Sequence, residues 1–357
     1  MSREEYFKGL ISGERRGIAD RLLFACLTCC AVPYGLFMRA RAAAYKFGLV
    51  PSRRLPKPVI SVGNITVGGT GKTPAVMLVA KELMARGKRV AVLTRGYGGS
   101  REGEVQIVSD GRSLLLEPGE AGDEPCLLAT AVPGLMVVMG ADRYRAGCLA
   151  LEKLDPDIFI MDDGFQHLRL KRDLDILLLD GTAPFATGRT LPAGLLREVP
   201  SAARRSDLVI YTRSEPGNPP DTGAVSGIPS TTSSHRISGC MPLTGGETKT
   251  LEILAGKRVI AFAGIADPAA FFDGLETQGV RLAATLAFPD HTPYGTQEME
   301  ALGRLKLSVK GDVLVTTAKD GVKLLPYSGI LRDCFVAQLE LVLHDPAPLH
   351  AALENFL

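Results

Sequence analysis

The sequence predicts an α/β protein with a doubly wound, mostly parallel sheet, a second, smaller α/β lobe and an N-terminal apolar helix. Three observations lead to this fold class. A glycine-rich loop separates an apolar run from a helical pattern near residue 70. Apolar runs then alternate with helical patterns as far as residue 212, and the alternation restarts near residue 258. Such alternation is typical of parallel sheets that carry helices on their faces.

The first element of this fold is the glycine-rich loop. The stretch 61–74 reads SVGNITVGGTGKTP, between an apolar run that predicts a strand at 59–62 and a helical pattern that starts near Ala75. In such an arrangement loop amides and a helix N-terminus bind phosphate, a lysine reaches the β- and γ-phosphates, and a hydroxyl ligates Mg²⁺. We therefore predict a nucleotide site of the P-loop type. Its residues are Thr66, Val67, Gly68, Gly69, Thr70, Gly71, Lys72 and Thr73.

One position of this loop departs from the usual pattern. The pattern G-x-x-x-x-G-K-[ST] has a glycine where this chain has Thr66. The alternative is a glycine-rich turn that only joins a strand to a helix. The preceding strand, the glycines, the Lys-Thr pair and the following helix together favour the nucleotide site.

The next apolar runs predict the rest of the larger sheet. We expect strands at 89–94, 137–139, 157–161, 174–179 and 208–212, and a short hairpin strand at 105–108. Ligands of an open α/β sheet gather at the carboxyl ends of its strands. Arg95 directly follows the strand at 89–94, so it either meets a phosphate or substrate or is a solvated loop arginine.

Acidic residues lie at two points of this sheet. Asp162 and Asp163 end the strand at 157–161, where an aspartate would hold Mg²⁺ or its water shell. Adjacent carboxylates repel each other unless they share a cation, which favours a metal site over an acidic turn. Asp123 and Glu124 open a helical pattern, so they are either helix caps or the source of the base that a kinase needs.

Other polar residues near the strand ends are weaker candidates. His167 follows the aspartate pair, and a lone histidine of this kind is more often structural. Arg197 and Glu198 lie in the loop 184–200 and are either an exposed pair or a phosphate contact and a metal contact.

The N-terminal apolar stretch at 22–38 carries no charge and is flanked by Arg21 and Arg39. It is shorter than the ~20 residues that cross a bilayer, and Pro33 and Gly35 interrupt it, so a spanning helix is disfavoured. A signal peptide is disfavoured because no small-residue cleavage site follows. A core helix and an interfacial membrane helix remain as alternatives.

The net charge and the cysteine content indicate which partners and which compartment suit this protein. A formal net charge of +2 and a pI near 8.1 provide no electrostatic footprint for nucleic acid. The seven cysteines have no regular spacing, which favours buried thiols in a reducing cytosol over a zinc or redox site.

A second α/β pattern follows a region rich in Pro, Gly, Ser and Thr. Strands are expected at 259–263, 282–288 and 312–317, with His291 exposed after the second; Lys319 and Asp320, after the third, either contact a nucleotide base or cap a helix. At 357 residues the chain is long enough for two lobes. We expect a membrane-associating helical segment at 1–50, a nucleotide-binding lobe at 51–213, a linker at 214–250 and a smaller C-terminal lobe at 251–357.

Seven motifs occur in an order that resembles the tetraacyldisaccharide 4′-kinase family of lipid A biosynthesis. The resemblance runs from the N-terminal segment to about residue 323, and the family carries the same Asn-x-Thr-x-Gly-Gly start of the loop. The motifs are the loop at 61–74, TRGYGG at 94–99, GDEP at 122–125, DDGFQH at 162–167, LLRE at 195–198, FPDH at 288–291 and TTAKD at 316–320.

The resemblance implies transfer of the γ-phosphate of ATP to the 4′-hydroxyl of tetraacyldisaccharide 1-phosphate, giving lipid IVA. It implies ATP and Mg²⁺ as cofactors, and the acylated disaccharide 1-phosphate lipid and the inner membrane surface as partners, and it names no protein partner. The expected location is the cytoplasmic face of the inner membrane, as a peripheral or monotopic protein. A lipid substrate also favours an interfacial anchor at 22–38.

The same resemblance implies roles for individual residues. Lys72 would act on the phosphates, Asp123 would accept the hydroxyl proton, and His291 would orient Asp123 across the linker, completing the site by closure of the lobes. The implied metal set is Thr73, Asp162, Asp163 and Glu198. The implied substrate set is Arg95, Arg143, Arg197, Gln166 and His167.

Two other classes of protein share a loop of this kind. An ATP-dependent ligase of the dethiobiotin synthetase kind has a similar loop but needs no apolar N-terminal segment. A nucleotide-switched metallochaperone or protein-targeting NTPase would be expected to carry a Cys/His cluster or a Met-rich groove, and neither pattern occurs in this sequence.

Overall fold

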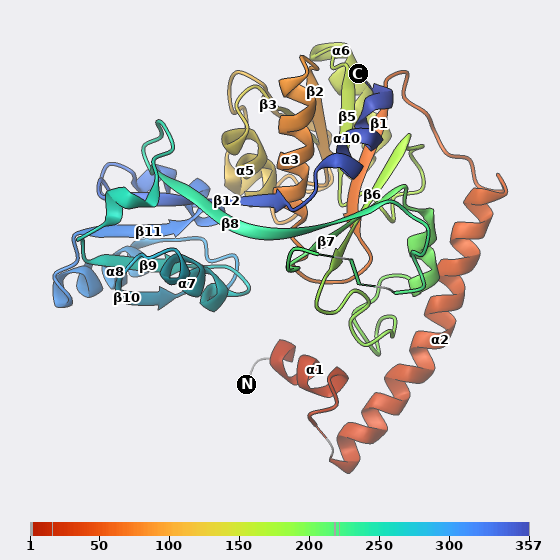
Figure 1. Ribbon diagram of the computed structural model, residues 1–357, viewed down its shortest axis with the longest axis horizontal. Helices are drawn as coiled ribbons and strands as arrows, with labels where there is room; N and C mark the ends of the chain where they lie inside the picture. Colours follow the sequence, from red (N-terminus) through yellow and green to blue (C-terminus); the bar gives the residue numbers. More distant parts are fainter. Residues whose placement is uncertain (1–2, 16, 218, 221, 357) are drawn as a thin grey trace.

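The computed structural model describes residues 3–15, 17–217, 219–220 and 222–356. A twelve-stranded sheet runs through both lobes, in the order β10-β9-β11-β12-β8-β7-β6-β1-β5-β2-β4-β3 (Figure 1). The strands of the larger lobe are β1 (Val59–Asn64), β2 (Val90–Thr94), β3 (Gln106–Asp110), β4 (Met136–Met139), β5 (Ile158–Asp162), β6 (Leu174–Asp180) and β7 (Leu208–Thr212). All are parallel except β3, the edge strand predicted as part of a hairpin, which is antiparallel to β4.

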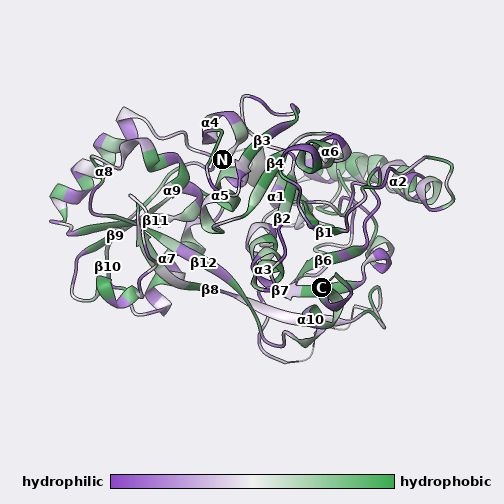
Figure 2. Ribbon diagram, turned by 90° about the horizontal axis from the view of Figure 1, so that it is seen from above, coloured by the Kyte–Doolittle hydropathy of each residue, from purple (hydrophilic) through white to green (hydrophobic). Residues whose placement is uncertain are grey.

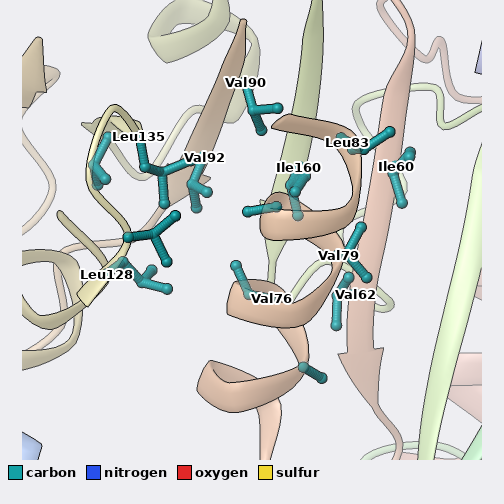
Figure 3. Close-up of a cluster of buried hydrophobic side chains, with 14 of the residues drawn as sticks. Ile60, Val62, Val76, Val79, Leu83, Val90, Val92, Leu128, Leu135 and Ile160 are labelled. Carbon is teal, nitrogen blue, oxygen red and sulfur yellow. The ribbon is translucent and has the colours of Figure 1, made fainter. Parts of the chain in front are cut away.

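Helices cover both faces of the larger sheet, because its strands are apolar on both sides. On one face lie α3 (Lys72–Ala85) and α5 (Asp123–Ala131), preceded by the short α4 (Pro118–Ala121); on the other lies α6 (Arg143–Lys153). Figure 3 shows Val76, Val79 and Leu83 of α3 against Ile60, Val62 and Ile160 of the sheet. Each such buried side chain contributes about 1.5–3 kcal/mol, so this face rigidly anchors the loop between β1 and α3.

The smaller lobe repeats this plan. Its parallel strands are β9 (Val259–Ala263), β10 (Leu282–Ala287) and β11 (Val313–Thr317). On one face lies α7 (Pro268–Thr277); on the other lie α8 (Thr296–Ser308) and α9 (Ala318–Leu324). The two lobes together confirm the predicted fold class. Short 3₁₀ helices occur at Pro200–Arg205, Leu251–Leu254, Leu325–Tyr327 and Glu354–Phe356.

Two long antiparallel strands, β8 (Ser230–Pro242) and β12 (Cys334–Leu343), join the lobes (Figure 1). The start of β8 also pairs with β7, so the stretch expected to be a linker contains a strand of the common sheet. Its polar residues are buried because their hydroxyls are bonded. Ser233 Oγ donates to the Tyr211 carbonyl at 3.0 Å, and Thr231 Oγ1 donates to the Asp345 carbonyl at 2.6 Å.

The C-terminal helix α10 (Ala347–Leu353) packs on β7 and β8, back in the larger lobe. Leu349 and Leu353 are fully buried in the same core as α3. The sequence places this segment in the smaller lobe, but β12 carries the chain out of that lobe again. The smaller lobe is therefore an insertion between β8 and β12.

The N-terminal region forms α1 (Arg3–Ile11) and one continuous helix, α2 (Ile18–Lys46), that passes through Pro33. Its 29 residues are about 43 Å long, and α2 is long and apolar enough to cross a membrane. Figure 2 colours much of α2 green along its length. Large apolar side chains are exposed on it, among them Ile18, Leu22, Val32, Leu36 and Phe37.

Candidate active site

The loop between β1 and α3 has the conformation of a phosphate cradle. Gly68 and Gly71 adopt positive φ angles of 121° and 77°, which side chains rarely allow. Asn64 stiffens the loop from within, because its Nδ2 donates to Thr70 Oγ1 at 2.7 Å and to Thr66 Oγ1 at 3.3 Å. Thr66, where the usual pattern has glycine, is thus part of a buried hydrogen-bonded network.

Two segments outside the loop also hold it in place. The Val67 amide donates to the Leu195 carbonyl at 2.7 Å, and the Arg197 amide donates to the Ile65 carbonyl at 2.8 Å. From the end of β7, Arg213 Nη2 donates to the Gly69 carbonyl at 2.6 Å. The backbone of the LLRE motif thereby holds the phosphate cradle in place.

Asp162 ends β5 beside β1, where Val62 is its partner in the sheet. Its side chain is buried and accepts a hydrogen bond from Thr94 Oγ1 at 3.1 Å. Burial, and then the nearby Glu124 and Asp163 carboxylates, raise the pKa of Asp162 to about 7, against the opposing effect of Lys72. Asp162, Glu124 and Lys72 therefore share one electrostatic environment at the mouth of the cradle.

Asp163 is paired with Arg197, whose Nη1 lies 2.9 and 2.7 Å from its two oxygens. Gln166 lies between this pair and β1: its Nε2 donates to the Asn64 carbonyl at 3.0 Å and its Oε1 accepts from Arg197 at 3.4 Å. The amide of Gln166, expected to contact substrate, thus braces the end of β1.

Helix α2 contacts the same residues from outside. Arg41 donates to the Gln166 carbonyl at 3.1 and 3.2 Å, and Tyr34 Oη donates to the Arg197 carbonyl at 3.0 Å. The buried stripe of α2, Ala31 and Gly35, packs on the loop before β7, where Thr190 Oγ1 donates to the Ala31 carbonyl. The apolar helix is therefore attached directly to the site.

Glu198 has a different partner from the one expected. It is almost fully buried, and both of its oxygens accept hydrogen bonds from Arg205, at 2.8 and 2.9 Å. It also lines a cleft of about 750 Å³ beneath α2, together with Arg39 and Arg204. Arg205 therefore neutralises this carboxylate, and the role of Glu198 as a metal ligand stays a prediction.

Two glycine motifs hold Asp123 in place. A Cβ on Gly122 would lie 2.3 Å from the Tyr97 carbonyl oxygen, and one on Gly99 would lie 2.2 Å from the Glu120 carbonyl oxygen. The TRGYGG and GDEP motifs are thus packed backbone to backbone, which only glycine permits. Asp123 is the first residue of α5 and makes no capping bond there, so its carboxylate is available for other partners.

The smaller lobe supplies those partners. His291 Nδ1 lies 3.2 Å from Asp123 Oδ2, and Lys323 Nζ lies 3.5 Å from the same oxygen. His291 itself has a left-handed backbone (φ 59°), held by bonds from its amide to Asp290 Oδ1 and the Gly264 carbonyl. Strain of this kind is concentrated at functional sites. Two residues far apart in the chain thus meet at the boundary between the lobes.

The remaining candidates differ in burial. Arg143 is buried, its Nη1 donates to the Gly140 carbonyl at 2.7 Å, and its Nε has no hydrogen-bond partner among the described residues. Burial lowers the pKa of Arg143, whereas Asp162 and Asp163 raise it. His167 is kept neutral, since burial and then Arg143 lower its pKa to about 4. Arg95 is exposed and paired with Glu102 at 3.2 Å.

Comparisons with known proteins identify the family of the chain. A family model described as tetraacyldisaccharide-1-P 4′-kinase matches residues 23–357. The chain belongs to this family. It is therefore an enzyme, a kinase of lipid A biosynthesis, as the motifs predicted.

Relatives and a solved structure agree with this assignment. The tetraacyldisaccharide 4′-kinase of Geobacter sulfurreducens is 54% identical, with all of both chains covered. That of Geobacter metallireducens is 56% identical over 95% of this chain and 99% of the relative. The structure of LpxK from Aquifex aeolicus in complex with ATP has a TM-score of 0.80 and 35% identity, and covers 94% of this chain and 99% of that chain. The ligase and switch alternatives are not supported.

Two residues contribute to this kinase site without standing out in the motifs. Asn64, which holds the loop, lies inside the quoted motif but was given no role of its own. Lys323 follows the last motif by three residues and contacts Asp123. The spacing of Lys319 and Lys323, i and i+4 on a helix, is a signal that could have identified the second.

Proposed function

We propose that this kinase transfers the γ-phosphate of ATP to the 4′-hydroxyl of tetraacyldisaccharide 1-phosphate, with Asp123 as the base. The contact between Asp123 and His291, 3.2 Å across the lobes, carries this proposal. A carboxylate held by an imidazole at the edge of a phosphate cradle suits removal of a proton from an alcohol. Lys72 at the start of α3 neutralises charge on the phosphates, and α5 packs against α3, so the base and the cradle are neighbours.

The residues at the cradle fit Mg²⁺. Asp162 is a buried carboxylate whose pKa is raised by two other carboxylates, and a cation would relieve that crowding. Among the described residues, no group of three or more His, Cys, Asp or Glu side chains could hold a metal ion. Mg²⁺ takes one or two carboxylates and completes its shell with water and phosphate oxygens. Asp162 and Thr73 would hold it, with Asp163 nearby, and it would neutralise charge that develops on the phosphates.

The basic residues beside the cradle suit a phosphorylated sugar headgroup. Arg143 is buried close to Asp162 and Asp163, and Arg95 is exposed directly after β2. Arg197 is held by Asp163 and therefore shapes the floor of the site.

A transfer assay tests the reaction. Purified protein with ATP and Mg²⁺ should phosphorylate the acylated disaccharide 1-phosphate in detergent micelles, with ATP consumption low in its absence. The same lipid with a 4′-deoxy sugar is the matched control, because it binds with the same chains and the same 1-phosphate. Equal ATP consumption with and without the 4′-hydroxyl would contradict the proposal.

We also propose that α2 holds the protein on the membrane surface. Its exposed face carries large apolar side chains, with Leu36 and Phe37 59% and 64% exposed, and the exposed Arg21, Arg39 and Lys46 suit anionic headgroups. The other stripe of α2 contacts the site through Tyr34 and Arg41, so the same helix would contact both the membrane and the site.

Changing Leu36 and Phe37 together to Glu should release the protein from vesicles that contain anionic lipid. Burial of each side chain contributes about 1.5–3 kcal/mol, so the partition should fall at least roughly tenfold in a flotation assay. Leu307→Glu with Ile330→Glu is the matched control, since both residues are as exposed but lie in the smaller lobe. If the α2 variant floats as well as the control, another surface holds the membrane.

A further inference from the structure

Helix α9 presents two lysines, one helical turn apart, to the Asp123–His291 pair. Lys319 Nζ lies 3.2 Å from His291 Nε2, and Lys323 Nζ lies 3.5 Å from Asp123 Oδ2. Neither lysine belongs to the phosphate cradle. Each therefore contacts one member of the pair from the smaller lobe.

Lys319 determines which imidazole nitrogen carries the proton. An ammonium group can only donate, so Nε2 of His291 must accept through its lone pair. The ring proton is then on Nδ1, which lies 3.2 Å from Asp123 Oδ2 and donates to it. Lys319 is itself held, because its Nζ also donates to Asp290 Oδ1 at 3.1 Å, and the same oxygen accepts the His291 amide at 2.9 Å.

The side chain of Lys323 is held by more contacts than that of Lys319. Its side chain is 7% exposed, donates to the Thr292 carbonyl at 3.0 Å and lies 5.4 Å from the centre of the Tyr294 ring. It also lies 3.5 Å from Oδ1 of the fully buried Asp320, whose Oδ2 accepts from the Gly264 amide and the Thr317 hydroxyl. A fixed ammonium group beside a carboxylate favours the ionised carboxylate.

We propose that Lys319 and Lys323 are positioning residues that hold the Asp123–His291 pair in one protonation state, with an ionised carboxylate and a neutral Nδ1–H imidazole. In this state Asp123 keeps a lone pair for the proton of the sugar hydroxyl, while His291 orients it. This inference rests on the proposed role of Asp123 as the base.

Other charged and titratable groups surround the pair and set the background for any dependence on pH. From α9 and the loop before α8 come Asp320 and Asp290. From α4 and α5 come Glu120, Glu124 and Cys126. Lys323 is the lysine that contacts the Asp123 carboxylate itself, at 3.5 Å.

The role of Lys319 can be tested without an activity assay. In protein labelled with ¹⁵N-histidine, with His291 assigned by its loss in His291→Gln, the wild type should show a protonated Nδ1 and an unprotonated Nε2 near pH 8. Lys319→Met should give a mixture of tautomers and lower kcat about tenfold, part of the roughly 10²–10⁴ that a positioned base supplies, with the KM for ATP unchanged. An unchanged spectrum and kcat in Lys319→Met would overturn the assignment.

The role of Lys323 is tested by the pH profile. Lys323→Met should move the acidic limb of kcat/KM to higher pH by about one unit, because the carboxylate loses its nearest cation. Lys323→Arg should restore the limb, which separates the charge effect from a packing effect if the Met variant is less stable. Lys306→Met is the control, since Lys306 pairs with Asp333 rather than with the site. A limb that stays in place in Lys323→Met would overturn the role of Lys323.

These outcomes are separable from failure of the proposed function. If Asp123→Asn kept full activity, the base role would fail. The tautomer of His291 in the wild type and in Lys319→Met would still report whether α9 fixes the pair.

Discussion

Asp123→Asn should lower kcat by roughly 10²- to 10⁴-fold, the contribution of a positioned general base, while the KM for ATP changes little. Asparagine keeps the size and most of the hydrogen-bonding capacity of the side chain but cannot accept a proton. It also caps helices as well as aspartate does, so a lost cap could not explain the result. Steady-state kinetics with the lipid acceptor measure both parameters.

Asp267→Asn provides the matched control for this substitution. Asp267 caps α7 in the smaller lobe, where its side chain accepts from the Ala270 amide at 3.1 Å, and it has no contact with His291. We expect its kcat to stay close to that of the wild type. A parallel rise in the KM for ATP in Asp123→Asn would reassign Asp123 to nucleotide binding.

Gly71→Ala should lower the free energy of unfolding of the ligand-free protein by about 2–4 kcal/mol. Part of this loss is the cost of a left-handed backbone for alanine, about 1–2 kcal/mol. The rest arises because the new Cβ would lie 2.5 Å from Nε2 of His235, a half-buried side chain of β8. Thermal unfolding without ATP should show a decrease of several degrees.

Gly69→Ala is the control for this effect on stability. It lies in the same loop, but its Cβ would meet no atom within 4 Å and its φ is not left-handed. Its unfolding temperature should stay within about a degree of the wild type. In Gly71→Ala with His235→Ala the contact is gone and only the backbone cost remains, so the two substitutions should be clearly non-additive. Additive losses would mean that His235 does not limit this position.

The parts of the fold that the sequence predicts well are those with locally visible patterns. The strand expected at 208–212 is β7, and the helical pattern expected near Ala75 lies in α3, because continuous apolar runs and 3.6-residue periodicity are properties of short windows. The placement of two site residues follows from the same logic: Asp162 ends β5 and His291 lies in the loop after β10, where ligands of such sheets gather.

The parts that the sequence misses depend on partners distant in the chain. The polar start of β8 is a strand because Thr231 and Ser233 bond to carbonyls of residues 345 and 211. Glu198 is a different case, because its partner Arg205 is only seven residues away, yet no local pattern separates an exposed pair from a buried one. The orientation of Lys319 toward His291 likewise exists only once the smaller lobe is folded.

Because the smaller lobe is inserted between β8 and β12, the carboxyl-terminal helix of this enzyme belongs to the larger, nucleotide-binding lobe. Leu349 and Leu353 complete the core around α3. Removing the last dozen residues would therefore destabilise the nucleotide-binding lobe and leave the smaller lobe intact. A fusion partner or affinity tag at the carboxyl terminus would be attached to the ATP-binding lobe. The strands and helices of the ATP-binding lobe all lie before or after the inserted lobe in the sequence. Replacing the insertion with a short turn between β8 and β12 would therefore give a minimal nucleotide-binding version of this protein.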